Sequence, residues 1–262
     1  MRKDHKGIYG LVSVIMPSYN CEAYIADAIE SVLNQSYRNL ELIICDDNSG
    51  DQTKEIISTY TNKDTRVKAV FNSENKGAAL SRNRCTEIAR GEYIAFLDAD
   101  DLWVTNKLDK QIGFMHANNS DFSCTGYYET DEGMKTIVSE VRPYPKVGYW
   151  KILFTGNPLG NSTVVYNANN LGKYYAPDIR KRNDFALWLD IARNNVKASG
   201  ILEPLAIYRR RKDSLSSNKM RLLKHQWNLY RNIEHLALPI SFAAMITWFF
   251  VKITNLRRKN VK

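Results

Sequence analysis

The first hundred residues alternate between short apolar runs and longer segments in which apolar residues recur at helical spacing. The apolar runs predict buried strands at residues 11–16, 40–45, 67–71 and 93–97. The segments between them predict helices at residues 23–34, 53–61 and 78–89. Strict alternation of strand and helix is typical of an α/β fold with a mostly parallel, doubly wound sheet. In such a sheet ligands bind at the carboxyl ends of the strands.

Each of these predicted strands is followed by a polar loop. The loops are Pro17-Ser18-Tyr19-Asn20, Asp46-Asp47-Asn48-Ser49, Asn75-Lys76-Gly77 and Asp98-Ala99-Asp100-Asp101. Because the carboxyl ends of parallel strands meet at one edge of a sheet, we expect the four loops to form a single site.

The last of these loops contains three carboxylates, Asp98, Asp100 and Asp101, directly after an apolar run. Like charges this close repel, and those beside a buried strand lose hydration, so a cation or a set of donors should lie among them. Oxygen ligands suit Mg²⁺ or Mn²⁺, which take one or two protein carboxylates and fill the other positions with water and substrate phosphates. The alternative is a solvated turn in which Asp101 caps a helix that begins near Thr105.

Beyond residue 105 the alternation fails. A helix is predicted at residues 107–118, short strands at 122–128 and 162–166, and a further helix at 184–194. This half therefore reads as an α+β elaboration that is continuous with the first. Near the end, residues 240–253 are apolar enough for a lipid interface but too few for a bilayer span.

The charge of the chain limits its partners. Of the 262 residues, 37 are Lys or Arg and 28 are Asp or Glu, so the net charge is +9, which suits phosphorylated substrates, an anionic membrane or nucleic acid. Basic clusters lie at 180–182, 209–212 and 257–259, without the aromatic motifs or zinc fingers of nucleic-acid binders. Four scattered cysteines and a charged, non-secretory N-terminus lead us to expect a cytoplasmic protein.

Four motifs carry a resemblance to a known family. They lie at residues 12–20, 46–49, 75–83 and 91–101. In this order they resemble the GT-A glycosyltransferases of family two. That implies a Rossmann-like GT-A fold, with a nucleotide-sugar-binding half at 1–104, an acceptor-binding half at 105–218 and a C-terminal helical tail at 219–262. It also implies an inverting transfer of a sugar from a nucleotide diphosphate to a hydroxyl, dependent on Mn²⁺ or Mg²⁺.

The resemblance assigns roles around the nucleotide base. Pro17 and Tyr19 would border the uracil of a UDP-sugar, and Asp47 would accept a hydrogen bond from it, with Asp46 as its neighbour. The alternative for Tyr19 is plain packing. For Asp47 it is a cap of the helix that follows, a role that Ser49 could also fill.

The same resemblance places Asp98 on the ribose and Asp100 on the metal ion, with Arg82 and Lys76 beside the nucleotide. An Arg on a helix is often only a solvated surface group. Arg211 stands where many relatives carry His. Arg cannot ligate a metal but can pair with a diphosphate, so Arg211 could close over the donor or lie in an exposed basic loop.

Inversion requires a carboxylate that deprotonates the acceptor hydroxyl, and we expect Asp184 to be this base. It precedes Leu187-Trp188-Leu189 in an element similar to the family's Glu-Asp-x-x-Leu-Trp-Leu, and a helix N-terminus keeps a carboxylate ionised. The alternative is that Asp184 only caps this helix. Asn183 departs from the family pattern, which has Glu at that position.

The resemblance is closest to enzymes that extend undecaprenyl-diphosphate-linked saccharides for O-antigen, capsule or exopolysaccharide. Two alternatives remain open: a polyprenyl-phosphate glycosyltransferase and a non-catalytic nucleotide-sugar-binding module of an assembly complex. From Pro239 onward we expect a helix on the anionic inner surface of the cell membrane, with Arg257, Arg258 and Lys259 at the headgroups, which would make the protein peripheral. A helix packed on the catalytic domain is the alternative for this tail.

Overall fold

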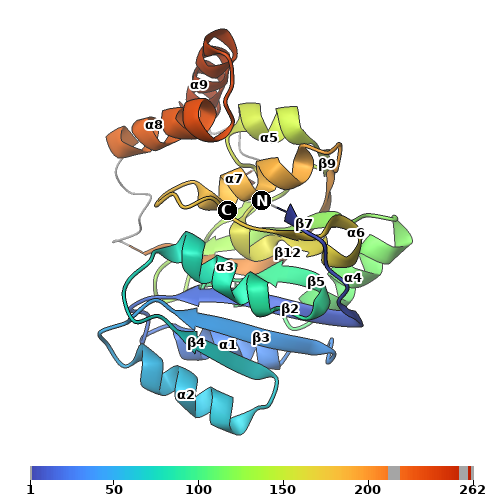
Figure 1. Cartoon of the computed structure of the whole chain (residues 1–262), viewed down its shortest axis with the longest axis vertical. Helices are drawn as coiled ribbons and strands as arrows, with labels where there is room; N and C mark the ends of the chain where they lie inside the picture. The colour runs from blue at the N-terminus through green and yellow to red at the C-terminus, as the bar shows by residue number, and fades with distance from the viewer. Residues whose placement is uncertain (1, 212–218, 254–258, 261–262) are drawn as a thin grey trace.

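A computed structural model of the chain describes residues 2–211, 219–253 and 259–260 (Figure 1). Four strands form the centre of the first half: β2 (Ile8–Ser18), β3 (Leu40–Asp46), β4 (Val67–Phe71) and β5 (Gly91–Phe96). Strand β2 pairs in parallel with both β3 and β5, and β3 pairs in parallel with β4. The predicted strands and their parallel pairing are confirmed, so the polar loops that follow them share one edge of the sheet.

Three helices connect these strands: α1 (Ile25–Leu33), α2 (Thr53–Lys63) and α3 (Ala78–Ile88). Each lies within two residues of its predicted position at both ends. Val14 and Met16 of β2 pack with α1 and α2 in one apolar core, whereas Ile15 packs with α3 in another. Successive side chains of a strand point to opposite faces, so this division places helices on both faces of the sheet, as a doubly wound fold requires.

The second half adds short strands and helices around the same sheet. Its strands are β6 (Leu102–Trp103), β7 (Phe122–Thr130), β8 (Ile137–Val141), β9 (Lys146–Val147), β10 (Val165–Asn167), β11 (Lys173–Tyr174) and β12 (Ala198–Arg209). Its helices are α4 (Lys107–Ala117), α5 (Tyr149–Thr155), α6 (Ala168–Leu171) and α7 (Asn183–Ala192). At the N-terminus, β1 (Arg2–Lys3) pairs with β11.

The sheet and its core continue from the first half into the second. Strand β10 pairs antiparallel with both β5 and β7, and β12 runs parallel to β7. The core on the α3 face also contains Trp188 of α7, whose ring lies edge-on to Phe96 of β5 with centroids 5.0 Å apart. The halves therefore share one core, and the domain bounds at 104 and 218 stay a prediction.

One predicted strand needs correction. Residues 162–166 were expected to be extended, but Asn161–Thr163 form a 3₁₀ turn and the strand β10 begins only at Val165. The Oγ of Ser162 in this turn accepts a hydrogen bond from the backbone N–H of Asp98 at 3.1 Å. The turn therefore supplies a hydrogen-bond acceptor at the end of β5. The apolar residues that follow it in the sequence gave no indication of this role.

The C-terminal part forms α8 (Lys219–Asn228), a π-helical turn (Leu229–Ile233), α9 (Leu238–Ile253) and the short strand β13 (Lys259–Asn260), which pairs with β8. Helices α8 and α9 lie at the opposite end of the molecule from α2 (Figure 1). None of the helices in the described part of the chain is long and apolar enough to cross a membrane. The cations Arg257 and Arg258 lie outside the described residues.

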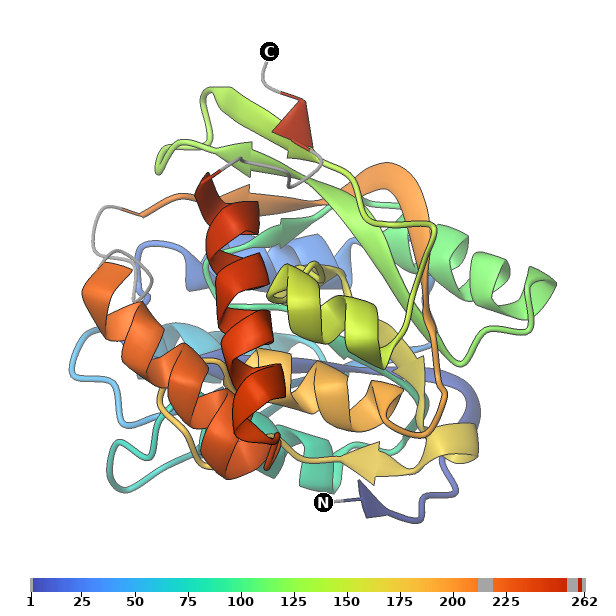
Figure 2. The ribbon, with the colours of Figure 1, turned by 90° about the horizontal axis from the view of Figure 1, so that it is seen from above.

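Helix α9 has one buried and one exposed face. Ala244 and Trp248 are buried, and α9 lies beside α5 (Figure 2). By contrast Ile246 is 56% exposed and Phe249 is 52% exposed. The alternative of a helix packed on the catalytic domain thus describes one face of α9, while the other face is an apolar surface.

The contact between α5 and α9 depends on Gly156, which ends α5 in the left-handed conformation (φ 73°). A Cβ at this position would lie 2.1 Å from Cδ1 of Trp248. Gly156→Ala should therefore destabilise the fold by more than the roughly 1–2 kcal/mol that left-handed backbone costs an L-residue, because Trp248 must also move. Urea unfolding followed by tryptophan fluorescence measures the loss.

Gly113→Ala is the matched control. Gly113 is exposed in α4 with nothing within 4 Å of an added Cβ, so the same change should stabilise the protein by about 0.5–1 kcal/mol. Equal stability of the Gly156→Ala variant and the parent would contradict the packing described for α9.

Candidate active site

An open cleft of about 970 Å³ lies over the carboxyl ends of β2 and β5. Six of the residues expected from the sequence line it: Tyr19, Arg82, Asp98, Asp100, Asp184 and Arg211. The other four do not reach its wall, namely Pro17, Asp46, Asp47 and Lys76. Of the four strand-end loops expected to form one site, those after β2 and β5 thus line the cleft, whereas residues 46–49 and 75–77 do not. Segments of the second half, at 157–163, 180–184 and 206–211, form much of the remaining wall.

Asp98 at the end of β5 is held by two side chains. Its Oδ1 accepts hydrogen bonds from Nη2 of Arg82 at 3.3 Å and from Nδ2 of Asn161 at 2.7 Å, and about a third of its side chain faces the cleft. Loss of hydration raises its pKa to about 6; the charges of Asp100 and Asp184 add to this rise and Arg82 opposes it. A cation in the cleft would relieve this cost.

Asp101 has a structural task. It is buried, its Oδ2 accepts a hydrogen bond from Ser162 Oγ at 2.5 Å, and its Oδ1 accepts one from the backbone N–H of Arg209 at 3.1 Å. Burial first, then the charges of Asp100 and Asp98, raise its pKa well above the usual range. The alternative that Asp101 caps a helix near Thr105 is wrong, because α4 begins only at Lys107 and its N-cap residue is Asn106.

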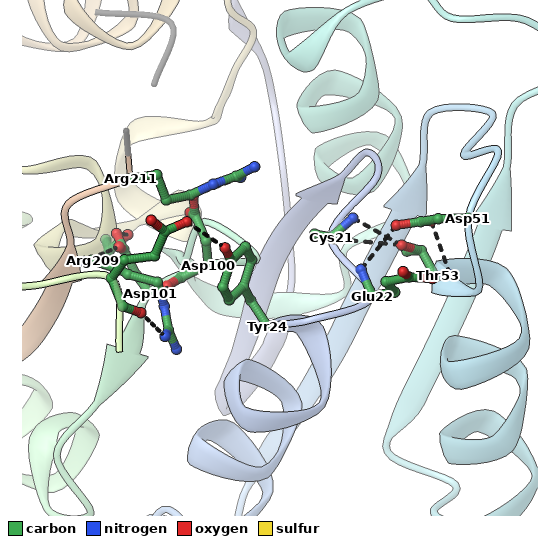
Figure 3. Close-up of polar contacts among 11 residues, drawn as sticks. Cys21, Glu22, Tyr24, Asp51, Thr53, Asp100, Asp101, Arg209 and Arg211 are labelled. Carbon is green, nitrogen blue, oxygen red and sulfur yellow. Dashed lines mark hydrogen bonds and ion pairs between the residues drawn. The ribbon is translucent and has the colours of Figure 1, made fainter. Parts of the chain in front are cut away.

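Asp100 faces two arginines from the end of β12 (Figure 3). Nη1 of Arg211 lies 3.3 Å from its Oδ2, and Nε of Arg209 donates to its backbone carbonyl at 3.0 Å. Both guanidinium groups also lie over the ring of Tyr24, at 4.6 Å for Arg209 and 4.9 Å for Arg211. Arg211 therefore pairs with a carboxylate of the site. The alternative, an exposed basic loop, did not include this contact.

The residues around Asp100 fit a divalent ion whose remaining ligands are phosphate oxygens of the substrate. No cluster of three or more His, Cys, Asp or Glu ligands occurs among the described residues, so the chain has no complete metal cage there. Mg²⁺ at a phosphate substrate needs only one or two carboxylates. Asp100 is 28% exposed and Asp98 is 35% exposed, and both line the cleft. Asp100 contributes to the raised pKa of Asp98, so a cation beside this pair would offset their repulsion.

The Asp46-Asp47 loop is organised by its own hydrogen bonds. Oδ1 of Asp47 accepts from Asn72 Nδ2 at 2.7 Å and from the N–H of Lys76 at 2.9 Å, and Oδ2 accepts from the N–H of Gly77 at 2.7 Å. Asp46 instead accepts from the N–H of Ser49 at 2.9 Å. The helix-cap alternative for Asp47 is wrong, since its partners lie in the 72–77 loop. Three of its about four lone-pair positions are therefore occupied within the protein, and Asp47 itself is buried.

Two further expectations lie at the edge of this loop. The ammonium of Lys76 lies 3.7 Å from Glu74, outside the cleft. Tyr19 is half-exposed and lines the cleft, so its ring is open to a stacking partner and the plain-packing alternative is wrong.

Arg82 is buried and joins two elements. Its Nη1 donates to Oδ1 of Asn183 at 2.5 Å, while its Nη2 reaches Asp98. The alternative of a solvated surface Arg is therefore wrong. Asn183 was noted in the sequence only as a departure from the family's Glu, and its contact with Arg82 was not foreseen. Through Arg82 the end of β5 is tied to the start of α7.

Asp184 lies in the first turn of α7, which begins at Asn183, and lines the cleft. The N-cap residue is Arg182, and no side chain caps this helix, so the cap alternative for Asp184 is wrong. Instead Oδ2 of Asp184 accepts a hydrogen bond from Nδ2 of Asn157 at 2.8 Å. Asn157, like Asn161 and Ser162, escaped the sequence analysis because it lies in an irregular segment with no motif.

The arrangement separates two kinds of chemistry. At the end of β5, carboxylates and arginines alternate and can bind a phosphate group together with a cation. At the start of α7, a single oriented carboxylate faces the same cleft and can accept a proton from a hydroxyl. The charge of Asp184 contributes to the raised pKa of Asp98, so the two parts are electrostatically close.

Comparison with known proteins agrees with this geometry. Residues 13–176 match the model of the family described as glycosyl transferase family 2. The glycosyltransferase TuaG of Bacillus subtilis (strain 168), named for teichuronic acid biosynthesis, is 40% identical over 242 residues, which cover 92% of this chain and 94% of TuaG.

A second relative and a solved structure add to this. WfgD of Escherichia coli, a UDP-Glc:α-D-GlcNAc-diphosphoundecaprenol β-1,3-glucosyltransferase, is 41% identical over 220 residues, 84% of this chain and 85% of WfgD. The crystal structure of S. aureus TarS 1–349 in complex with UDP superposes with a TM-score of 0.65 at 22% identity and covers 93% of this chain and 72% of that one. That structural likeness concerns the fold.

Proposed function

The chain belongs to glycosyl transferase family 2, and we propose that it transfers a hexose from a UDP-sugar to a hydroxyl of an undecaprenyl-diphosphate-linked saccharide. One observation carries the proposal: the cleft holds an acidic, arginine-paired phosphate end and a separately oriented carboxylate, Asp184. The likeness to WfgD over most of both chains supports the choice of donor and acceptor. The product would be a repeat unit of an O-antigen, capsule or related surface polysaccharide.

On this proposal the nucleotide binds along the ends of β2, β3 and β5. Tyr19 offers an exposed ring to the uracil, with Pro17 beside it. Asp47, at the end of the neighbouring strand, would accept a hydrogen bond from the base. Asp46 and Lys76 support this pocket from outside the cleft, through the loops that they order. Asp98, held by Arg82, is placed to accept from the ribose hydroxyls.

The diphosphate of the donor then lies at Asp100. We propose that Asp100 holds Mn²⁺ or Mg²⁺, an ion that would neutralise the charge developing on the leaving UDP. Arg211 contacts the same carboxylate and can pair with a phosphate oxygen, because its planar guanidinium suits that geometry. Together these groups would stabilise the leaving group where charge develops.

Asp184 acts on the acceptor in this mechanism. Its carboxylate removes the proton of the acceptor hydroxyl while that oxygen attacks the anomeric carbon on the face opposite UDP, so the configuration inverts. The hydrogen bond from Asn157 fixes the orientation of the carboxylate. A polyprenyl-phosphate acceptor needs no general base, and a non-catalytic module needs no oriented carboxylate, so Asp184 favours the saccharide acceptor over both alternatives.

The exposed face of α9 supports a peripheral position at the inner surface of the cell membrane. Ile246, Phe249 and Phe250 on this helix, and Trp150 on the neighbouring α5, are all more than half exposed. A lipid-linked acceptor would be met at such a surface, and the helix would lie in the interface without spanning it.

The first prediction concerns the base. Asp184→Asn should bind UDP nearly normally but transfer sugar roughly a hundredfold or more slowly, the usual scale for a lost general base. Calorimetry with UDP and a transfer assay provide the two readouts. Asp178→Asn is the matched control, because this exposed Asp precedes the same helix without lining the cleft. Loss of UDP binding in the Asp184 variant would show that the assignment is wrong.

A second prediction concerns the metal. Transfer by the wild type should stop in EDTA and return with Mn²⁺ or Mg²⁺, whereas Asp100→Ala should lose activity by several orders of magnitude and not recover with excess metal. Its thermal unfolding should stay close to that of the parent, because Asp100 is part-exposed. Glu74→Ala, in an exposed loop, serves as the control. Full wild-type activity in EDTA would refute the metal.

The third prediction concerns membrane binding. Replacing Ile246 and Phe249 together by Ser should weaken flotation on anionic liposomes at least tenfold, since each buried apolar side chain contributes about 1.5–3 kcal/mol. Replacing Ile8 and Tyr9 by Ser removes comparable exposed apolar surface elsewhere and should leave flotation unchanged. Equal flotation of both variants would contradict a role for α9.

A further inference from the structure

We propose that Arg180, Lys181 and Arg182, on the cleft wall just before α7, bind the diphosphate of the lipid-linked acceptor. The inference rests on the proposed function, since it assigns a second phosphate subsite beside the one at Asp100. The sequence shows these three cations as a cluster, and neither the donor site nor the base accounts for them. All three line the same cleft as Asp184.

The position of the cluster follows from the backbone. Arg182 is the N-cap residue of α7 in a left-handed conformation (φ 67°), two residues before Asp184. An Arg in this conformation is uncommon, and the surrounding fold must impose it. The three cations are thereby held on the wall directly beside the proposed base, which is where the group next to the reacting sugar must bind.

The charge balance of the cleft distinguishes Arg180 from the cations that lie outside the cluster. Arg82 pairs with Asp98, Arg211 with Asp100, Arg142 with Glu140 and Arg210 with Glu129. Arg180 is exposed and lines the cleft, and no ion pair joins it to any other residue in the described ranges. Positive charge without a carboxylate partner is what a doubly charged ligand would neutralise, and Arg and Lys are the side chains that bind phosphates best.

The cluster lies between the base and the apolar helix. Asn183 faces Arg82 and through it the donor end of the cleft, whereas the guanidinium of Arg182 lies 5.8 Å from the ring of Trp248 in α9. Val251 of α9 also lines the cleft. Along the cleft wall, Asp184 is followed by the three cations and then by the apolar helix α9. The acceptor carries its sugar hydroxyl, its diphosphate and its hydrocarbon chain in the same order.

Both the nucleotide donor and the lipid acceptor carry a diphosphate, so the test must distinguish which of the two the cluster binds. The probe is farnesyl diphosphate, titrated by calorimetry into wild-type protein that is already saturated with UDP and Mn²⁺. It should bind, and farnesyl monophosphate should bind more weakly. Arg180→Ala with Lys181→Ala should weaken farnesyl diphosphate binding at least tenfold while UDP affinity stays within twofold, because each charge-assisted contact to phosphate is strong.

The matched control replaces Lys6 and Lys63 by Ala, two exposed cations away from the cleft with the same change of net charge, and should bind the probe as the parent does. Unaltered probe binding in the Arg180 and Lys181 variant would overturn the proposal. So would failure of the probe to bind the UDP-saturated wild type. Loss of binding to phosphatidylglycerol vesicles without loss of probe binding would assign the cluster to membrane headgroups instead.

Kinetics separate this inference from the proposed function. The same variant should raise KM for a lipid-diphosphate-linked saccharide at least tenfold with little change in kcat, and leave transfer to the octyl glycoside of the same sugar unchanged. A wild type that binds the probe through the cluster but glycosylates no lipid-linked saccharide would refute the proposed function and leave the diphosphate subsite standing. An equal rise in KM for both acceptors would refute the subsite.

Discussion

Three carboxylates at the end of one buried strand impose the constraint on which the cleft depends. Each needs a partner, and each finds it in a different part of the chain. Asp98 takes Arg82 from α3, Asp101 takes Ser162 and the backbone of Arg209, and Asp100 takes Arg211. Because a carboxylate that loses hydration is costly without a partner, these contacts hold α3, the 3₁₀ turn and the end of β12 against the end of β5. The cleft is the space that they enclose.

The same contacts extend to the acceptor side. Arg82 reaches Asn183 as well as Asp98, so one buried guanidinium links the phosphate end of the cleft to the first turn of α7. The neighbouring Asp184 is held by Asn157, one residue after the Gly156 that admits Trp248 of α9. The position of the proposed base therefore depends on both the donor site and the tail. Helix α5 contacts both α7 and α9, so it connects the tail to the helix that carries Asp184.

The sequence was sufficient to predict those elements that depend on the spacing of apolar residues and on the order of the strands. The strands at 11–16, 40–45, 67–71 and 93–97 follow from short apolar runs that alternate with helical segments, and their ends share one edge because the strands are parallel. It was not sufficient to predict the roles of residues that depend on polar contacts with distant parts of the chain. No local feature of the sequence distinguishes the buried Asp101 from the part-exposed Asp100. None marks Asn157, Asn161 or Ser162 either, whose partners lie 27 to 64 residues away. The two faces of α9 likewise become distinct only against α5.

In the proposed mechanism one oriented carboxylate, Asp184, drives direct displacement of UDP by an acceptor hydroxyl in this cleft. A single displacement inverts the anomeric carbon, whatever the sugar. Proton NMR of the disaccharide formed from an α-linked UDP-hexose on a lipid-diphosphate-linked N-acetylglucosamine reports that configuration directly. The account predicts a β-linked product from the first turnover onward. An α-linked product would contradict it, because retention needs a second displacement or a different mechanism that Asp184 as a base does not provide.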